Sequence, residues 1–224
     1  MAVENIGNLV LYKNNQLIAL HKPAGMAVQD DPSQDVSLMQ LAEIYCKKKL
    51  RLIHRIDRPA SGLVLFAKSA SAAAALSEQF QNRSIQKHYL ALTKNALPDK
   101  EGQLHHHLSK NSRNNKSIAH TEAGPQTKEA KLHYQWLGKS DFYHLWQIEL
   151  LTGRHHQIRA QLAAMDCPIK GDVKYGARRR NPDRSIHLHA WKLQFEHPTS
   201  GESVLITAPP PDEAIWKAFA EVLS

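Results

Sequence analysis

Cysteine is scarce in this sequence, and long hydrophobic runs are missing from it. The chain has two cysteines, Cys46 and Cys167, which are too few for a disulfide scaffold and match no zinc-ligand spacing. Polar residues such as Glu4 and Lys13 interrupt the N-terminal segment, so it lacks the apolar core of a signal peptide. No apolar run approaches the roughly 20 residues that span a bilayer. We therefore expect a reduced, cytoplasmic protein that is neither secreted nor inserted into a membrane.

Glycine and proline are modest in number, and acidic residues are outnumbered. Ten glycines and eleven prolines exclude a collagen-like or linker-dominated chain, and 42% hydrophobic residues exclude disorder by composition. Lysine and arginine number 29 against 21 acidic residues, which gives a net charge of +8. This surplus suits a polyanionic partner such as nucleic acid. A soluble protein that is basic for other reasons would show the same balance.

The 224 residues allow one large domain or two small ones. Strands are predicted at residues 9–12, 17–20, 63–66, 89–93, 132–136, 146–150, 191–195 and 204–207. Helices are predicted at residues 37–50, 69–83 and 153–165, and after a cap at Asp212. Residues 95–128 are polar and are predicted as long loops around one or two short strands. Because strands and helices interleave without strict βαβ alternation, we predict one α+β domain over residues 1–224, with a mixed, mostly antiparallel sheet.

A polar loop that leads directly into a buried strand is the most informative stretch. Asp57 lies on this loop between Arg55 and Arg58. Pro59 restricts the backbone, and Gly62 removes a side chain where another molecule could approach closely. The alternative is an ordinary surface turn with an Asp–Arg ion pair, worth about 0–1 kcal/mol.

A second basic stretch lies at residues 151–159. Arg154 and Ile158 are four residues apart and are predicted to share a helix face, where they could orient a carboxylate and cover a planar base. An ordinary basic helix is the alternative. His155 and His156 are adjacent, so we expect their side chains to point in different directions, and no Cys or Glu completes a zinc set. No metal site is predicted.

A third stretch joins a turn-rich loop to a run of arginines. Gly171 and Gly176 bracket the loop. The arginines that follow are candidates for RNA phosphate contacts, although a solvated charged loop would have the same composition. They are Arg178, Arg179, Arg180 and Arg184.

Several enzyme classes are excluded by motifs that are missing. A protein-kinase loop places Asp directly after Arg, whereas Ile56 separates Arg55 from Asp57. No P-loop and no dinucleotide-binding fingerprint occurs. Ser61 lacks the preceding glycine of a nucleophile elbow.

Six motifs follow one another in a fixed order between His21 and Pro211. In chain order they are His21 to Met26, His54 to Leu63, Lys87 to Ala91, Gly153 to Arg159, Gly171 to Gly176, and the late pair Leu188 to Ala190 and His197 to Pro198. In this order they resemble the RluA-type RNA pseudouridine synthase family. The departures are Ile56 for Leu, Ala60 and His155 for Thr, and Gln161 where the family commonly has His.

The resemblance implies an isomerase that needs no cofactor, metal or consumed water. Asp57 would be the essential carboxylate, acting on the sugar, on the base or on a sugar proton. Arg154 would pair with Asp57, and Tyr89 would lie against the uracil as a stacking surface or as the base for the C5 proton. Ile158 would cover the other side of the base. His54 and Arg55 would bind the substrate, Arg55 by filling the gap of a flipped base, and Arg58 and the four arginines of the third stretch would bind RNA.

The resemblance also implies the partners and leaves alternatives. The substrate would be a uridine of ribosomal or transfer RNA, and the protein is expected to be a monomer. About 20 residues precede Lys22, too few for the N-terminal S4 domain of some relatives, so a stand-alone catalytic domain is expected. The alternatives are a catalytically silent RNA-binding protein of the same fold and a hydrolytic N-glycosidase that uses Asp57 with Asp172.

Overall fold

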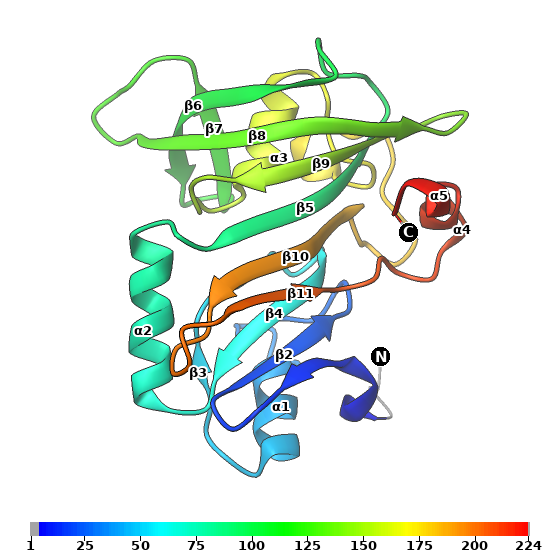
Figure 1. The fold of residues 1–224 in the computed structure, drawn as a ribbon. Helices are drawn as coiled ribbons and strands as arrows, with labels where there is room; N and C mark the ends of the chain where they lie inside the picture. Colours follow the sequence, from blue (N-terminus) through cyan, green and yellow to red (C-terminus); the bar gives the residue numbers. More distant parts are fainter. Residues whose placement is uncertain (1–4, 224) are drawn as a thin grey trace. The chain divides into compact units, whose positions relative to one another are not determined.

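The computed structural model describes residues 5–223. Contacts within the chain divide it into two compact units (Figure 1). The first unit comprises Met1–Lys87 and His189–Pro210, and the second comprises His88–Leu188 and Pro211–Ser224. Both units contain helices and mostly antiparallel strands, so the predicted α+β class is confirmed.

The first unit is built on strands in the order β1 (Val10–Lys13), β2 (Leu17–Lys22), β4 (Ser61–Ala67), β10 (Leu188–Glu196), with β11 (Ser203–Thr207) on β10 and β3 (Arg51–Leu52) on β4. All seven residues of β4 are buried, as its apolar run predicts. β4 pairs with β10 in parallel. Gly62 has φ +117°, and a Cβ there would lie 2.3 Å from the Ala190 carbonyl oxygen. The close neighbour of Gly62 is therefore a strand of its own unit.

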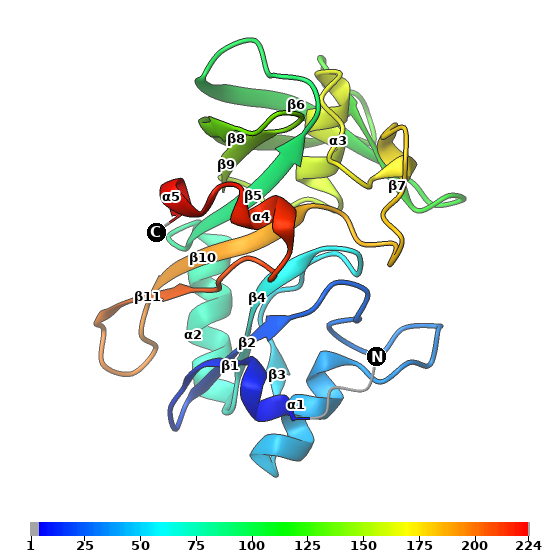
Figure 2. The same cartoon turned by 90° about the vertical axis from the view of Figure 1, so that its right-hand side faces the viewer.

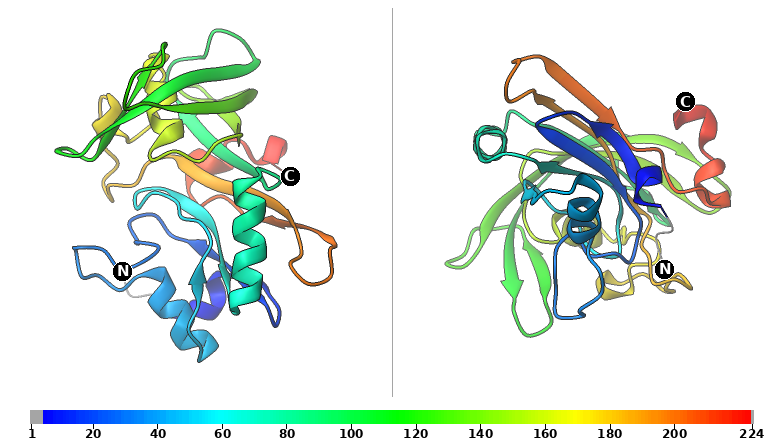
Figure 3. Two further views of the ribbon diagram at one scale, coloured as in Figure 1. Left: turned by 90° about the vertical axis from the view of Figure 1, so that its left-hand side faces the viewer. Right: turned by 90° about the horizontal axis from the view of Figure 1, so that it is seen from below.

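Among the described residues of the first unit, three helices accompany these strands. The 3-10 helix η1 (Ile6–Leu9) precedes β1. Helix α1 (Leu38–Cys46) begins at a capping box formed by Ser37 and Gln40 and ends at Lys47, whose φ is +50°. It is shorter than predicted because Lys47 adopts the left-handed conformation that closes a helix. Helix α2 (Ala70–Gln81) is capped by Ser69 and lies beside the strands of this unit (Figure 3). Its Ala72 and Leu76 pack in one cluster with β4.

The second unit has strands in the order β5 (Gln86–Thr93), β9 (His144–Leu150), β8 (Lys128–Lys139), β6 (Glu101–Asn111) and β7 (Lys116–His120). Helix α3 (Gln157–Ala164) covers one face of these strands (Figure 2). Ala160 packs there with Leu108 and Ala130. The predicted long loops at residues 95–128 are wrong, since β6 alone has eleven residues. Leu104, His106 and Leu108 point inward in β6, and a histidine in that apolar alternation obscures the strand pattern.

The helix predicted at residues 153–165 begins later than predicted. His156 adopts φ +51° directly before α3, so Gly153 and Arg154 lie in a loop. The C-terminal helix is two short helices, α4 (Ala214–Lys217) and α5 (Ala220–Leu223), and the residue before α4 is Glu213 rather than the predicted Asp212. The 3-10 helix η2 (Val173–Tyr175) follows α3. Within residues 5–223 no helix has the length and apolarity needed to cross a membrane.

Candidate active site

The predicted site residues divide between the two units. Residues of the first unit are His54, Arg55, Asp57 and Arg58. Residues of the second unit are Tyr89, Arg154, Ile158, Arg178, Arg179, Arg180 and Arg184.

Asp57 lies on the loop that connects β3 to β4, as predicted. The buried side chains of Ile56 and Ala60 anchor the loop on both sides of it. The Asp57 carbonyl accepts a hydrogen bond from the Ala60 N–H at 3.1 Å, which closes a turn over Pro59. The Asp57 side chain is partly exposed, so the carboxylate is presented from a constrained backbone.

Arg58 ties this loop to residues 25–35. Its Nε donates to the Gly25 carbonyl at 2.8 Å, and Nη1 donates to Asp31 at 3.0 Å and to the Ser33 hydroxyl at 2.7 Å. Nη2 donates to Asp35. Hydrogen bonds from Ser33 and the Arg58 charge hold the pKa of Asp31 below its usual range. The guanidinium therefore has a structural role, and its predicted contact with RNA stays a prediction.

Lys22 supports the same loop from the end of β2. The side chain is buried, and Nζ donates to the carbonyls of Pro23, Met26 and Arg58 at 2.9, 2.8 and 3.1 Å. Burial lowers the pKa of Lys22 to about 7, while the negative charge of Asp57 acts in the opposite direction. Sequence reasoning placed Lys22 in a motif without a role. The available signal was a lysine directly before proline at the end of a buried strand.

His54 is also held within the first unit. Its Nε2 accepts the Leu65 N–H at 3.1 Å, and its ring stacks on Phe80 with the centroids 5.4 Å apart. Burial, together with the charge of Lys87, lowers the pKa of His54 to about 4. A neutral His54 thus attaches the start of the loop to β4 and α2, whereas Arg55 is exposed.

Tyr89 and Arg154 lie in different elements of the second unit. Tyr89 is in β5 opposite Ile148 of β9, and its side chain is partly exposed. Arg154 lies in the loop between β9 and α3, where its Nε donates to the Glu129 carbonyl at 2.9 Å. Ile158 is buried in the first turn of α3. The predicted sharing of a helix face by Arg154 and Ile158 is therefore wrong, because the left-handed residue His156 separates them.

The two adjacent histidines before α3 do not point apart as predicted. The rings of His155 and His156 stack with centroids 3.8 Å apart. The Ser117 hydroxyl donates to the His155 carbonyl at 2.6 Å, and the Tyr175 hydroxyl lies 2.9 Å from His156 Nδ1. Burial and then the charge of Arg159 lower the pKa of His156 to about 2. Among residues 5–223 no group of three or more His, Cys, Asp or Glu is arranged to hold a metal ion.

Asp172 forms a buried ion pair with Arg159. Nε and Nη2 of Arg159 donate to the two carboxylate oxygens at 2.7 and 2.9 Å. The side chains are 4% and 1% exposed, so the carboxylate of Asp172 does not reach solvent. The ion pair links α3 to the residue that precedes η2.

Hydrogen bonds of buried polar side chains hold the arginine-rich loop in place. Buried Asn181 accepts from Lys170 Nζ at 2.7 Å and donates from Nδ2 to the Ser185 carbonyl at 3.0 Å. The His187 ring contacts the same Nδ2 at 3.0 Å and Glu213 at 3.1 Å. The loop thereby presents exposed side chains on a fixed backbone; these are Arg178, Arg179, Arg180 and Arg184.

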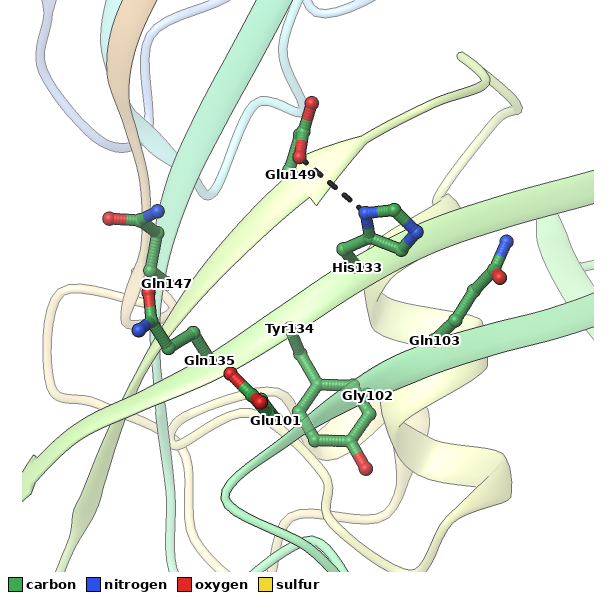
Figure 4. A pocket seen from close by; sticks show the side chains of 8 residues that line it. All are labelled: Glu101, Gly102, Gln103, His133, Tyr134, Gln135, Gln147 and Glu149. Carbon is green, nitrogen blue, oxygen red and sulfur yellow. Dashed lines mark ion pairs between the residues drawn. The ribbon is translucent and has the colours of Figure 1, made fainter.

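A polar groove of about 560 Å³ lies on β6, β8 and β9 (Figure 4). His133 and Glu149 meet across it with Nδ1 and Oε2 3.6 Å apart. Its other lining residues are Glu101, Gly102, Gln103, Tyr134, Gln135 and Gln147. None of the predicted site residues lines this groove.

The fold and the sequence both match one class of proteins. The chain superimposes on the structure of human RNA pseudouridylate synthase domain containing 1 with a TM-score of 0.78 and 24% identity, covering 98% of this chain and 90% of that one. This likeness defines the fold as that of pseudouridylate synthase domains. A sequence profile described as RNA pseudouridylate synthase matches residues 16–164.

Curated relatives agree with that match. The chain is 34% identical over 213 residues to ribosomal large subunit pseudouridine synthase C of Buchnera aphidicola, covering 90% of this chain and 67% of the relative. It is 32% identical over 221 residues to tRNA pseudouridine synthase C of Haemophilus ducreyi, covering 89% of each. The share of the relative falls to 62% and 58% for two further proteins. The chain belongs to the RNA pseudouridylate synthase family, a family of isomerases, as the motifs predict.

Proposed function

We propose that this chain isomerises a uridine of ribosomal or transfer RNA to pseudouridine, with Asp57 as the essential carboxylate. The observation that carries the proposal is the construction of the Asp57 loop. Lys22 donates a hydrogen bond to the Arg58 carbonyl, and the Arg58 side chain donates to the Gly25 carbonyl. Ile56 and Ala60, on the two sides of Asp57, are buried. A carboxylate on so constrained a loop is suited to a reaction that needs one aimed group and no cofactor.

The other roles follow from the chemistry that Asp57 requires. Arg154 pairs with Asp57 and orients its carboxylate. Tyr89 stacks on the uracil or accepts its C5 proton, and Ile158 covers the opposite side of the base. Arg55 fills the gap left by the flipped nucleotide, and His54 orients the loop that carries Arg55 and Asp57.

RNA binding rests on charge. The net charge of +8 and the arginines of the loop after η2 supply contacts with phosphates that do not depend on sequence. Relatives named for ribosomal and transfer RNA support these two RNAs as substrate classes. We further propose a cytoplasmic monomer with one catalytic domain over residues 1–224, which uses no metal or cofactor.

The N-glycosidase alternative needs Asp172 as a second carboxylate beside Asp57. Asp172 is buried against Arg159 and cannot act on a substrate water without breaking that ion pair. Loss of the ion pair would leave a buried charge uncompensated, at a cost of about 3–5 kcal/mol.

The test is pseudouridine mapping with purified protein. Unmodified ribosomal and transfer RNA carrying tritium at uracil C5 are incubated with the wild-type chain and with Asp57→Ala. Tritium release with a mapped pseudouridine, absent from the variant, is the expected result. Free uracil in place of pseudouridine would indicate a glycosidase, and RNA binding without tritium release would indicate a silent binding protein.

A further inference from the structure

The loop that carries Arg154 completes an open edge of β8. β9 ends at Leu150, opposite Leu132, so the residues of β8 before Leu132 extend beyond its reach. Backbone groups at such an edge need other partners. The N–H groups of Leu151 and Thr152 both donate to the Lys131 carbonyl, at 3.2 and 3.3 Å. The chain after β9 therefore stays attached to β8 for one more residue position.

Two buried side chains complete the edge. The Thr152 hydroxyl accepts from the Lys131 N–H at 2.9 Å and donates to Gln157 Oε1 at 2.8 Å. Gln157 Nε2 donates to the Lys131 carbonyl at 3.0 Å. Thr152 and Gln157 are 4% and 3% exposed. The backbone N–H of Lys131 is therefore bonded to the loop, and its carbonyl is bonded to the loop and to the first residue of α3.

Arg154 is held by the same arrangement. Gln157 Oε1 accepts the Arg154 backbone N–H at 2.9 Å, and Arg154 Nε donates to the Glu129 carbonyl at 2.9 Å. The second hydrogen bond uses only one N–H of the guanidinium. The backbone of Arg154 is fixed by Gln157, and its side chain is fixed to the same edge of β8.

We propose that Gln157, together with Thr152, is a positioning residue for Arg154 in the isomerisation. This inference rests on the proposed function, because it assumes that Arg154 acts on Asp57. Gln157 sets the backbone from which the guanidinium extends, and Thr152 fixes the rotamer of Gln157 by bonding its Oε1. A guanidinium that grips a carboxylate through two hydrogen bonds depends on orientation as well as on charge.

The same helix supplies a matched control. Gln161 lies one turn after Gln157 and is also buried. Its Nε2 donates to the carbonyls of Leu104 and Ala130 at 3.1 and 3.2 Å, and its Oε1 has no hydrogen-bond partner among residues 5–223. Replacing either glutamine by methionine keeps the volume and removes hydrogen bonds to strand carbonyls. Only one replacement releases Arg154.

The kinetic experiment compares Gln157→Met with Gln161→Met on the mapped RNA. For Gln157→Met we expect kcat to fall about 10- to 100-fold with KM within about twofold of wild type, because misplacing a catalytic group by about 1 Å can cost about 100-fold. For Gln161→Met we expect wild-type kcat at a similar loss of thermal stability. Should Gln157→Met fail to fold, Thr152→Val tests the same hydrogen bond, and Thr152→Ser, which keeps the hydroxyl, should restore kcat.

A second measurement does not depend on activity. NMR follows hydrogen exchange of the Arg154 and Arg159 Nε–H groups separately. In Gln157→Met and Thr152→Val, exchange at Arg154 should accelerate about tenfold or more, while exchange at Arg159, bonded to Asp172, stays unchanged. Unchanged exchange at Arg154, or equal loss of kcat in the two methionine variants, overturns the inference. A wild-type chain that makes no pseudouridine overturns the proposed function instead, and the exchange rates still decide whether Gln157 holds Arg154.

Discussion

Arg159 and Asp172 form a buried ion pair in which two N–H groups of one guanidinium donate to both oxygens of one carboxylate, at 2.7 and 2.9 Å. The Tyr175 ring lies 4.9 Å from the Arg159 guanidinium carbon. The Tyr175 hydroxyl in turn accepts from the Ser117 N–H at 2.8 Å. The ion pair thus links α3 to the residue before η2, and Tyr175 links η2 to β7. These elements adjoin the Arg154 loop and the arginine-rich loop.

Removing one partner of this pair should be costly. Asp172→Ala leaves Arg159 charged and buried, so we expect the free energy of unfolding to fall by about 3–5 kcal/mol. Asp212→Ala breaks the exposed pair with Lys217 and should change it by about 0–1 kcal/mol. Urea denaturation measures both. A decrease below about 1 kcal/mol for Asp172→Ala would show that the pair contributes little. The double variant Arg159→Met/Asp172→Leu should recover most of the stability.

Asp57→Asn should abolish isomerisation and leave folding and RNA binding intact. Asp57 is partly exposed, so replacing its carboxylate by an amide leaves the core unchanged while removing the reacting group. Turnover on the mapped RNA should drop below about 1% of wild type, since loss of an essential group costs on the order of 10³-fold or more. Thermal unfolding and a filter-binding assay are the controls. Higher residual activity in a folded, RNA-bound variant would remove Asp57 from the central role.

Arg154→Lys keeps the charge and loses the planar fork that grips a carboxylate with two hydrogen bonds. It also loses the Nε–H that donates to the Glu129 carbonyl. We expect kcat to fall more than about tenfold with a much smaller change in RNA affinity. Single-turnover kinetics and equilibrium binding separate the two effects. If binding weakens while kcat is spared, Arg154 binds a phosphate.

The four exposed arginines of the loop after η2 should bind phosphates without contributing to chemistry. For every phosphate that a variant no longer neutralises, the slope of log K against log[salt] should fall by about 0.7–0.9. The quadruple glutamine variant at positions 178, 179, 180 and 184 should therefore bind more weakly, mainly at low salt, with kcat at saturating RNA preserved. A salt titration beside the wild type measures this. Parallel lines with equal affinity would show that this loop does not touch RNA.

The stability of the chain should fall in mild acid partly through His54. Its pKa is lowered to about 4, so between pH 6.5 and 4 the unfolded state binds a proton that the folded state does not. The contribution is complete above pH 6.5 and is lost as pH falls toward 4, by at most about 1.4 kcal/mol per pH unit. His54→Gln, which keeps an acceptor for the Leu65 N–H, should flatten the profile by this amount. Urea unfolding at pH 7, 6 and 5 measures it, and an equal difference between the two proteins at all three values would contradict the assignment.

The sequence predicted a helix or strand correctly where the signal lies within that segment itself. The apolar run at residues 63–66 predicted β4, and of the two predicted caps of the next helix, Asp35 and Ser37, it is Ser37 that begins α1. Burial and capping are both signalled by neighbouring residues. β6 was missed because His106 occupies an inward position whose burial depends on Gln161 of α3, which lies 3.1 Å from it. The start of α3 was misplaced because the left-handed backbone of His156 accompanies contacts with distant elements, of His156 with Tyr175 in η2 and of His155 with Ser117 in β7.

The sequence by itself determined the family, since six motifs in one order identify it, and with the family came Asp57, Tyr89 and Arg154 as candidates. It also determined the basic charge and most of the strands, whose signals are periodic and local. Only the tertiary structure decided what holds those candidates in place: Lys22 beneath the Asp57 loop, Gln157 behind Arg154, and the burial of Asp172 against Arg159. These residues act through hydrogen bonds to backbone groups or to side chains of other elements. The residues next to them in the sequence carry no pattern that would identify the bonding partner.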